Sequence, residues 1–271
     1  MFRSTFCVAA LAIATFCFVA HGEDPLPDGS EIIANVNARD DGQHVHLRAT
    51  ITLRDKNGSE RVRESVSWRK YFGDEKKTLF FFVSPANIRD TGFLTFDYAK
   101  ADRDDDQWLY LPAARKVRRI SSSDRGDFFV GTDFTFEDIK KESKVSAEDF
   151  TFQTLGAETI DGHTCYKVEA VPVDEQTAKE LGYARGVSWF DPEIWLSRRT
   201  EQYDANGKLL RTILSQDIEQ VDGIWIARKA TAKTERSGHS TIFEFTEVDY
   251  ASPVEDSLFT ERSLSRGARG E

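Results

Sequence analysis

The strongest constraint on the fold is a strictly alternating segment from Gln43 to Arg54. Because successive side chains of a β-strand point to opposite faces, this pattern predicts a half-buried antiparallel strand. Asn57-Gly58 follows it and supplies the positive φ angles of a tight hairpin, which returns the chain into a second strand over residues 60–72. The apolar positions of the first strand are Val45, Leu47, Ala49, Ile51 and Leu53.

Turn signals recur through the rest of the chain, each with a glycine beside a residue that is common in turns. They are Gly73-Asp74, Asp161-Gly162, Asn206-Gly207, Asp222-Gly223 and Ser237-Gly238. Regular spacing of strands and turns predicts a meandering sheet or barrel. No internal repeat or low-complexity linker divides the sequence. We therefore expect a single β domain over residues 23–271, in which residues 263–271 form a flexible tail.

Helical signals are few. Asp28 or Ser30 is a suitable N-cap for an amphipathic helix that ends before Gly42. Its apolar positions are Ile32, Ile33 and Val36. A second helix is expected over residues 174–181, because a glycine stop follows it directly. Residues 134–141 add a turn or two of helix.

Residues 79–83 break the alternating rule, because all five are apolar. A strand in an antiparallel sandwich usually meets the core with one face and water with the other. Here both faces must be covered. Two arrangements satisfy this requirement: a strand buried by protein on both sides, or a strand with one face under a helix and the other lining an apolar hollow.

The N-terminal residues have the organisation of a cleaved export signal. Arg3 supplies a positive charge, an apolar run of about 15 residues spans Phe6 to Ala20, and a small residue stands at Gly22. A membrane-spanning helix needs about 20 apolar residues. A bulky phenylalanine precedes Cys17, which argues against lipid attachment there. We expect residues 1–22 to be removed and a soluble protein to be exported.

Composition excludes several classes of partner and cross-link. Cys7 and Cys17 leave with the signal, so Cys165 remains alone and an internal disulfide is excluded. The formal net charge of −10 disfavours nucleic acid and anionic membrane surfaces as bulk partners. A mean hydropathy of −0.48 beside 20 phenylalanines and 5 tryptophans indicates a polar shell around an aromatic interior. Stable membrane insertion is not expected.

The most distinctive stretch runs from Trp108 to Ile139 and joins an aromatic strand, a basic strand and a Gly-Thr-Asp turn. This combination points to a binding surface and not to a reaction centre. Residues 108–120 (WLYLPAARKVRRI) and 131–138 (GTDFTFED) resemble the motifs of the LolA-like outer membrane lipoprotein-sorting proteins of the bacterial envelope. The resemblance continues at Gly162, Cys165, Pro172, residues 187–191, residues 203–207, residues 223–225 and residues 259–264. The sequence departs from the family at Arg198-Arg199, where a proline is more usual.

The resemblance implies an incomplete, strongly curved antiparallel β-barrel with helices closing its mouth and a hydrophobic cavity that holds acyl chains. The helices from Ser30 and near Lys179 would form the lid. It further implies a periplasmic location and work beside an inner-membrane export machine. A carrier needs a dry concave wall, because each buried methylene contributes about 0.8 kcal/mol. The candidates for this wall, each of which also suits an ordinary core, are Val45, Leu47, Ile51, Phe80, Phe82, Trp108 and Tyr110.

The basic strand has two interpretations. As a partner or anion contact, Arg115, Lys116, Arg118 and Arg119 would meet a lipid phosphate or an acidic surface of a membrane partner. As structural groups, they would pair with nearby carboxylates. These are Asp104, Asp105, Asp106, Asp124, Asp127 and Asp133.

Other polar motifs have weaker indications. Asp133 or Thr132 is expected to cap a helix that begins near Phe134, and an anion site at that helix start is the alternative. His44 and His46 share a strand face without a third metal ligand at a typical spacing. Residues 102–106 lack the glycine and distal glutamate of a calcium loop. Cys165 is interpreted as a small buried apolar residue. No nucleophile elbow, zinc-protease motif or P-loop is present, so neither catalysis, a metal nor a cofactor is expected.

Three functions stay open at this point. The first is a periplasmic carrier or chaperone that shields acyl chains of lipoproteins or lipids between envelope membranes. The second is a non-carrying accessory or sensor subunit that docks on an inner-membrane export complex. The third is an envelope hydrolase, which remains because a fold does not fix a function. An apolar hollow inside the curved sheet would favour the carrier.

Overall fold

The computed structural model describes residues 25–98 and 105–268. The predicted export signal at residues 1–22 lies outside the described residues, as do Asp102 and Asp104 of the acidic segment at residues 102–106. Within the described ranges, thirteen strands form one antiparallel sheet in the order β6-β5-β4-β3-β2-β1-β13-β12-β11-β10-β9-β8-β7. The N-terminal strands are β1 (His44–Arg54), β2 (Glu60–Phe72), β3 (Glu75–Ser84), β4 (Gly92–Asp97), β5 (Asp106–Leu111) and β6 (Lys116–Arg119). The C-terminal strands are β7 (Phe150–Ile160), β8 (His163–Pro172), β9 (Arg185–Asp191), β10 (Leu196–Tyr203), β11 (Leu209–Val221), β12 (Ile224–Thr234) and β13 (His239–Asp249).

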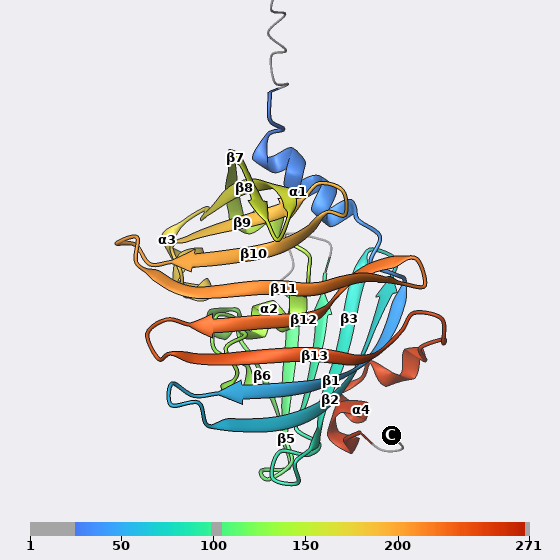
Figure 1. Cartoon of the computed structure of the whole chain (residues 1–271). Coiled ribbons are helices and arrows are strands. Elements are labelled where there is room, and N and C mark those ends of the chain that lie inside the picture. The colour runs from blue at the N-terminus through green and yellow to red at the C-terminus, as the bar shows by residue number, and fades with distance from the viewer. Residues whose placement is uncertain (1–24, 99–104, 269–271) are drawn as a thin grey trace, which may run out of the picture.

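Two meanders build the sheet, and they join where β1 pairs with β13. Figure 1 shows the sheet bending strongly, so that β3 and β5 run behind the strands from β11 to β2 and cross them. β6 and β7 remain as the two edges of the sheet, which leaves the barrel incomplete. The predicted strongly curved, incomplete antiparallel β-barrel is confirmed.

β1 folds as its sequence pattern predicts. Buried and partly exposed residues alternate along the whole strand. The strand pairs with β2 from His44 to Arg54, and Gly58 in the intervening hairpin has a φ of 85° that favours glycine. The five other glycine-containing turns also connect consecutive strands. Local pattern therefore positions both meanders.

Residues 120–149 connect β6 at one edge of the sheet with β7 at the other. They contain α2 (Phe136–Lys141), and three of their phenylalanines are buried in the main core with Phe80 and Phe82. These are Phe129, Phe134 and Phe136. The aromatic half of the conspicuous stretch at residues 108–139 is thus interior packing and not the expected binding surface. The reason is that this crossover runs over the concave face, where its phenylalanines pack against Phe80 and Phe82.

The predicted helices are present. α1 (Gly29–Ala38) begins after Asp28, whose side chain accepts from the backbone N–H of Ser30 at 2.8 Å. α3 (Glu175–Leu181) begins after Asp174, whose side chain accepts from the backbone N–H of Thr177 at 2.7 Å, and ends at Gly182 in the left-handed conformation. Each helix has a side-chain acceptor for an otherwise unpaired N–H group at its start, which explains why the helices begin there.

β3 is covered on both faces, as its apolar run requires. Phe80 and Phe82 belong to the core on the concave face, and Leu79 and Phe81 belong to a second core on the convex face. α4 (Glu261–Arg266) completes this second core with Leu264, which is fully buried. The expectation of a flexible tail from residue 263 is therefore wrong for residues 263–268, because Leu264 is needed to cover β3 and β4.

The contact of α4 with the sheet depends on a glycine. A Cβ atom at Gly92 would lie 2.4 Å from the ring of Phe81 and 2.8 Å from a methyl group of Leu264. Only a residue without a side chain lets both groups approach β4. The convex face is thus closed by tight packing at this position.

Leu264→Ala is expected to lower the free energy of unfolding by about 2–5 kcal/mol, because it leaves a cavity in the second core. Urea unfolding followed by tryptophan fluorescence measures this change. The exposed neighbour Ser265 offers the control, since Ser265→Ala removes no buried contact. Equal stability of the two variants would contradict the role assigned to α4.

Candidate functional site

The concave face of the sheet and the segments that cross it surround a cavity of about 370 Å³. Strands from β3 through β1 and β13 to β7 line it, together with α1, α2, the end of α3 and residues 142–146. This volume lies in the range of roughly 300–1,000 Å³ that is usual for small-ligand sites. Its apolar walls include Phe80, Phe190, Ile213 and Phe243. The cavity can therefore take an apolar ligand of small-molecule size.

Strand pairing aligns the wall residues in rows across the sheet. Leu47 pairs with Ser67 and Ser67 with Phe80, so that one row crosses β1, β2 and β3. A second row crosses β13, β12 and β11 through Phe243, Ala230 and Ser215. Both rows mix large apolar residues with small ones. Small residues at interior positions of a curved sheet leave space that larger side chains would fill.

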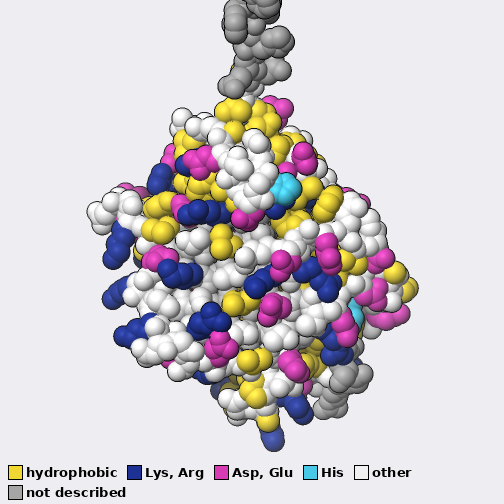
Figure 2. All heavy atoms as spheres, in the orientation of Figure 1, with side chains coloured by type: hydrophobic (Ala, Val, Ile, Leu, Met, Phe, Trp, Pro, Cys, Tyr) yellow, Lys and Arg dark blue, Asp and Glu magenta, His cyan; other side chains and the backbone are white. Residues whose placement is uncertain are grey.

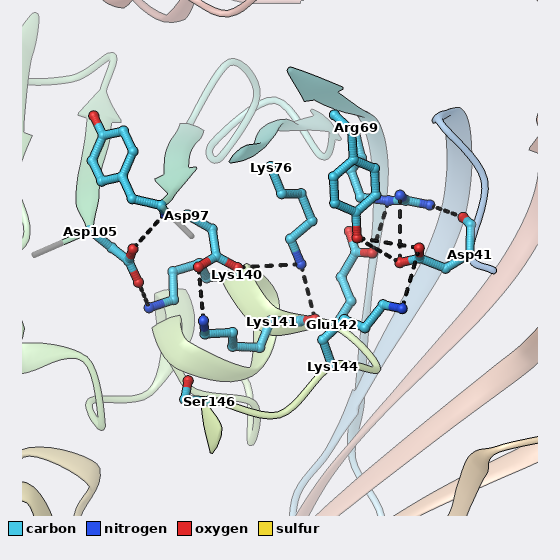
Figure 3. Close-up of polar contacts among 12 residues, drawn as sticks. Asp41, Arg69, Lys76, Asp97, Asp105, Lys140, Lys141, Glu142, Lys144 and Ser146 are labelled. Atoms are coloured by element: carbon cyan, nitrogen blue, oxygen red, sulfur yellow. Dashed lines mark hydrogen bonds and ion pairs between the residues drawn. The ribbon is translucent and has the colours of Figure 1, made fainter. Parts of the chain in front are cut away.

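One end of the cavity is charged. We call the residues there the polar cluster: Arg39, Asp41, Arg69, Glu142 and Lys144. Figure 3 shows Arg69, Asp41, Glu142 and Lys144 converging from separate segments of the chain. Arg69 is 2% exposed, donates to the carbonyl oxygen of Gly42 at 3.0 Å and pairs with Glu142 at 3.2 Å. The cluster reaches solvent at Glu142, whose side chain is 30% exposed.

Burial sets the ionisation of this cluster. Desolvation lowers the pKa of Arg39 and of Lys144, although Asp41 opposes the shift for both groups. Desolvation also lowers the pKa of Lys76, which lies beside Glu142 in Figure 3 and donates to the carbonyl oxygen of Lys141 at 3.0 Å. Burial and Asp41 together raise the pKa of Tyr71, which donates to that carboxylate. The polar cluster as a whole holds three cations, Arg39, Arg69 and Lys144, and two carboxylates, Asp41 and Glu142.

Comparison with known proteins shows the family to which this chain belongs. A family model described as "uncharacterized protein"-like matches residues 74–266. The crystal structure of a DUF1329 family protein from Desulfovibrio piger is 28% identical in sequence, with a TM-score of 0.79 over 87% of this chain and 97% of that chain. A putative outer membrane lipoprotein-sorting protein domain from Vibrio parahaemolyticus is also 28% identical, with a TM-score of 0.79 over 88% and 98% of the two chains. The chain belongs to the LolA-like family.

A more distant structure has the same fold. The LolA superfamily protein NE2245 from Nitrosomonas europaea is 18% identical, with a TM-score of 0.66 over 88% of this chain and 100% of that chain. No curated protein matches the sequence significantly. No helix within the described ranges is both long enough and apolar enough to cross a membrane.

The seven predicted wall residues of this LolA-like chain fall into three groups. Val45, Leu47 and Phe80 line the cavity. Ile51 and Phe82 are fully buried in the core that adjoins it and do not line it. The prediction that Trp108 and Tyr110 line the cavity is wrong, because both pack against the second core on the convex face. Their neighbour Leu109 faces the concave side, since side chains alternate along β5.

Sequence reasoning missed the wall residues of the C-terminal meander. Phe243 and Phe245 both line the cavity and are two positions apart in β13. Their period-two spacing was the available signal. The polar cluster was missed for a different reason: its members come from the end of α1, from β2 and from the loop after α2, so that no local motif contains them.

The Gly-Thr-Asp turn has a different role from the expected one. Thr135 caps α2, and its hydroxyl accepts from the backbone N–H of Asp138 at 3.1 Å, with the Asp138 carboxylate returning the contact in a capping box. Asp133 is instead buried under β12 and β13, where its carboxylate accepts from Thr234 at 2.6 Å and Thr241 at 2.7 Å. The prediction that Asp133 or Thr132 caps the helix is wrong, because Thr135 holds the N-cap position, two residues after Asp133 and three after Thr132.

The basic strand is partly neutralised by its own surroundings. Arg118 lies 3.3 Å from Asp124 and Arg119 lies 2.5 Å from Asp106, and both pairs belong to the expected structural set. Arg115 and Lys116 are exposed at the edge of the sheet, away from the cavity lining. Figure 2 shows acidic and basic side chains interspersed over the outer face of the sheet that is in view. Pairs of this exposed kind contribute little binding energy or stability.

Potential metal ligands are also explained by local contacts. His46 stacks on Trp68 with ring centroids 5.3 Å apart. The ligand atoms of His163, Asp191 and Glu193 lie within 4.8 Å of one another. Arg198, however, lies 2.7 Å from the buried carboxylate of Asp191 and places a positive charge against this group. A divalent cation would have to displace or oppose that guanidinium.

Cys165 is fully buried, and burial followed by the charge of Asp191 raises the pKa of its thiol to about 11. The thiolate is the reactive form, so it is scarce at pH 8 in the folded protein. We expect alkylation of Cys165 by iodoacetamide at pH 8 to be at least about tenfold slower in the native state than in urea, as judged by mass spectrometry. Equal rates would contradict the burial of this thiol.

Proposed function

We propose that this LolA-like protein is a periplasmic carrier that shields acyl chains of lipoproteins or lipids in its cavity during transfer between envelope membranes. One observation carries the proposal: the concave face of the incomplete barrel surrounds a cavity of about 370 Å³ with aliphatic and aromatic walls. Apolar walls attract a hydrocarbon chain without fixing one pose, which suits a ligand that must be released again.

The energetics favour a chain of several methylene groups. Each methylene removed from water contributes about 0.8 kcal/mol, so eight of them supply roughly 6 kcal/mol before the costs of association. The walls are contributed by both meanders, from Phe80 in β3 to Phe190 in β9.

The carrier function is tested on protein purified from its native envelope without detergent. Lipid extraction and mass spectrometry are expected to find acyl chains in roughly stoichiometric amounts, and the emptied protein is expected to bind a fluorescent fatty acid. Absence of extracted lipid together with absence of probe binding would refute the proposal. Edman sequencing of the same material tests cleavage after Gly22.

The accessory-subunit alternative receives less support. Two of its four candidate docking residues, Arg118 and Arg119, are already paired with Asp124 and Asp106. An inner-membrane transporter remains the proposed partner for loading or unloading the carrier. Its capture by chemical cross-linking in intact cells, and the loss of that capture when the cavity is filled, would connect docking with cargo.

A further inference from the structure

The carboxylates that line the cavity near α2 and α3 each contact a cation. These pairs are Glu137 with Lys140 at 2.9 Å, Asp138 with Arg211 at 2.7 Å, and Asp149 with Arg125 at 2.7 Å. Lys140, Arg211 and Arg125 do not themselves line the cavity. The surrounding protein therefore neutralises the carboxylates near α2 and α3. Little of their negative charge remains to repel or attract a ligand.

The polar cluster lacks this balance. Arg39 donates to the carbonyl oxygens of Asp40 at 3.1 Å and Trp225 at 3.3 Å and to the hydroxyl of Ser143, all of which are uncharged. Among the residues that the structure describes, no carboxylate forms an ion pair with Arg39, and its Nε atom is buried without a hydrogen-bond partner. Arg39 lines the cavity, and a guanidinium that keeps a buried, unused donor is suited to an anionic acceptor.

Lys144, like Arg39, contacts mainly uncharged backbone oxygens. Its ammonium group donates to the carbonyl oxygens of Asn37 at 2.9 Å and Arg39 at 2.6 Å, and it lies 3.5 Å from Asp41. Asp41 also accepts from Tyr71 and lies 3.6 Å from Arg69, so one carboxylate serves several donors. Lys144 and Arg39 therefore present more positive charge to the cavity than Asp41 neutralises.

A buried hydroxyl gives a second, independent indication. Thr78 lines the cavity, is 3% exposed, and its Oγ1 atom has no hydrogen-bond partner within the described part of the chain. It pairs with Arg69 across β2 and β3, and Arg69 pairs with Val45 across β2 and β1. A buried polar group without a partner costs about 1–3 kcal/mol. An oxygen-rich ligand group beside this row would accept a hydrogen bond from the hydroxyl group of Thr78.

We propose that the cavity takes an amphiphile whose head carries anionic oxygens, a phosphate or a carboxylate, beside Arg39, Lys144 and Thr78. Its hydrocarbon tail lies against Leu47, Phe80 and Phe243. This inference rests on the proposed carrier function and narrows its cargo. Acyl chains joined through uncharged esters or amides would leave the cations unmatched, whereas an anionic head would match them. Desolvation by burial lowers the pKa of Arg39 and of Lys144, and the opposing charge of Asp41 does not offset it.

The test uses three ligands with one tail and different heads: dodecyl phosphate, dodecanol and dodecyltrimethylammonium. The affinity of each ligand is measured by its displacement of a fluorescent fatty acid from the delipidated full-length mature protein. Each ligand is kept below its own critical micelle concentration. Dodecyl phosphate is expected to bind about tenfold to a hundredfold more tightly than dodecanol, because charge-assisted hydrogen bonds are the strong ones. Dodecyltrimethylammonium is expected to bind most weakly. A fourth ligand, dodecanoate, tests a carboxylate head and is expected to behave like dodecyl phosphate.

Two variants test whether Arg39 and Lys144 cause the preference for the phosphate head. Arg39→Gln and Lys144→Gln are each expected to lower the preference for phosphate over alcohol by about fivefold or more, mainly through weaker binding of dodecyl phosphate. Retained dodecanol affinity also shows that each variant is folded. Lys208→Gln removes an exposed cation in the turn after β10 and serves as the matched control, with no change in preference.

The outcomes separate this inference from the carrier function. Equal affinity for the three heads would overturn the anionic-head inference and leave the carrier function standing. Failure of all three ligands and of the probe to bind would refute the carrier function itself. Inorganic phosphate that competes as strongly as dodecyl phosphate would show a site for a free anion, and would overturn the assignment to a lipid head.

Discussion

Ala230→Trp is expected to abolish most acyl-chain binding while leaving the fold intact. Ala230 lines the cavity in the row formed by Phe243 in β13 and Ser215 in β11. An indole at this position occupies space that a hydrocarbon tail would otherwise use. Displacement of only two methylene groups costs about 1.6 kcal/mol, which corresponds to more than a tenfold loss of affinity.

Titration of a fluorescent fatty acid measures this loss, and thermal unfolding shows whether the variant remains folded. Ala205→Trp places the same indole in an exposed turn and is the matched control. Ser215→Phe fills the same row from the neighbouring strand, so the test does not depend on one substitution. Unchanged affinity in both cavity variants would show that the acyl chain binds elsewhere, and would remove the main support for the carrier function.

The local elements of the fold were predictable because their signals lie within a few residues. The alternation of β1, the hairpin at Gly58 and the caps at Asp28 and Asp174 each follow from adjacent side chains. A covered second face for β3 also followed, because an apolar run without alternation must be buried on both sides. The sequence pattern did not predict which helix covers β3, because α4 lies more than 170 residues further along the chain.

The candidate site was only partly predictable for the same reason. The phase of β5 relative to the cavity cannot be read from WLYL, because both faces of that segment are apolar. A shift of one residue exchanges the two faces, which placed Trp108 and Tyr110 on the wrong side. Long-range pairing fixes the phase: Leu109 pairs with Phe93, and Phe93 with Phe80 on the concave face.

The buried carboxylate of Asp133 is expected to be the most sensitive polar position for stability. It accepts from Thr234 at 2.6 Å, from Thr241 at 2.7 Å and from a ring nitrogen of His239 at 2.5 Å. Its backbone N–H donates to Thr241, and its carbonyl oxygen accepts from Arg211 at 2.8 Å. This one residue thus fixes the crossover segment to β11, β12 and β13.

Asp133→Ala is expected to lower the free energy of unfolding by about 3–5 kcal/mol, because it leaves the buried hydroxyl of Thr241, the partly buried hydroxyl of Thr234 and a ring nitrogen of His239 without their acceptor. Asp133→Asn keeps one acceptor oxygen and is expected to cost less, about 1–3 kcal/mol. Asp127→Ala changes an exposed carboxylate in the same segment and should stay within about 0.5 kcal/mol of the parent protein. Urea denaturation orders the three variants. If Asp133→Ala proved as mild as Asp127→Ala, the crossover would have to be held by its phenylalanines alone, and the Gly-Thr-Asp motif would need another explanation.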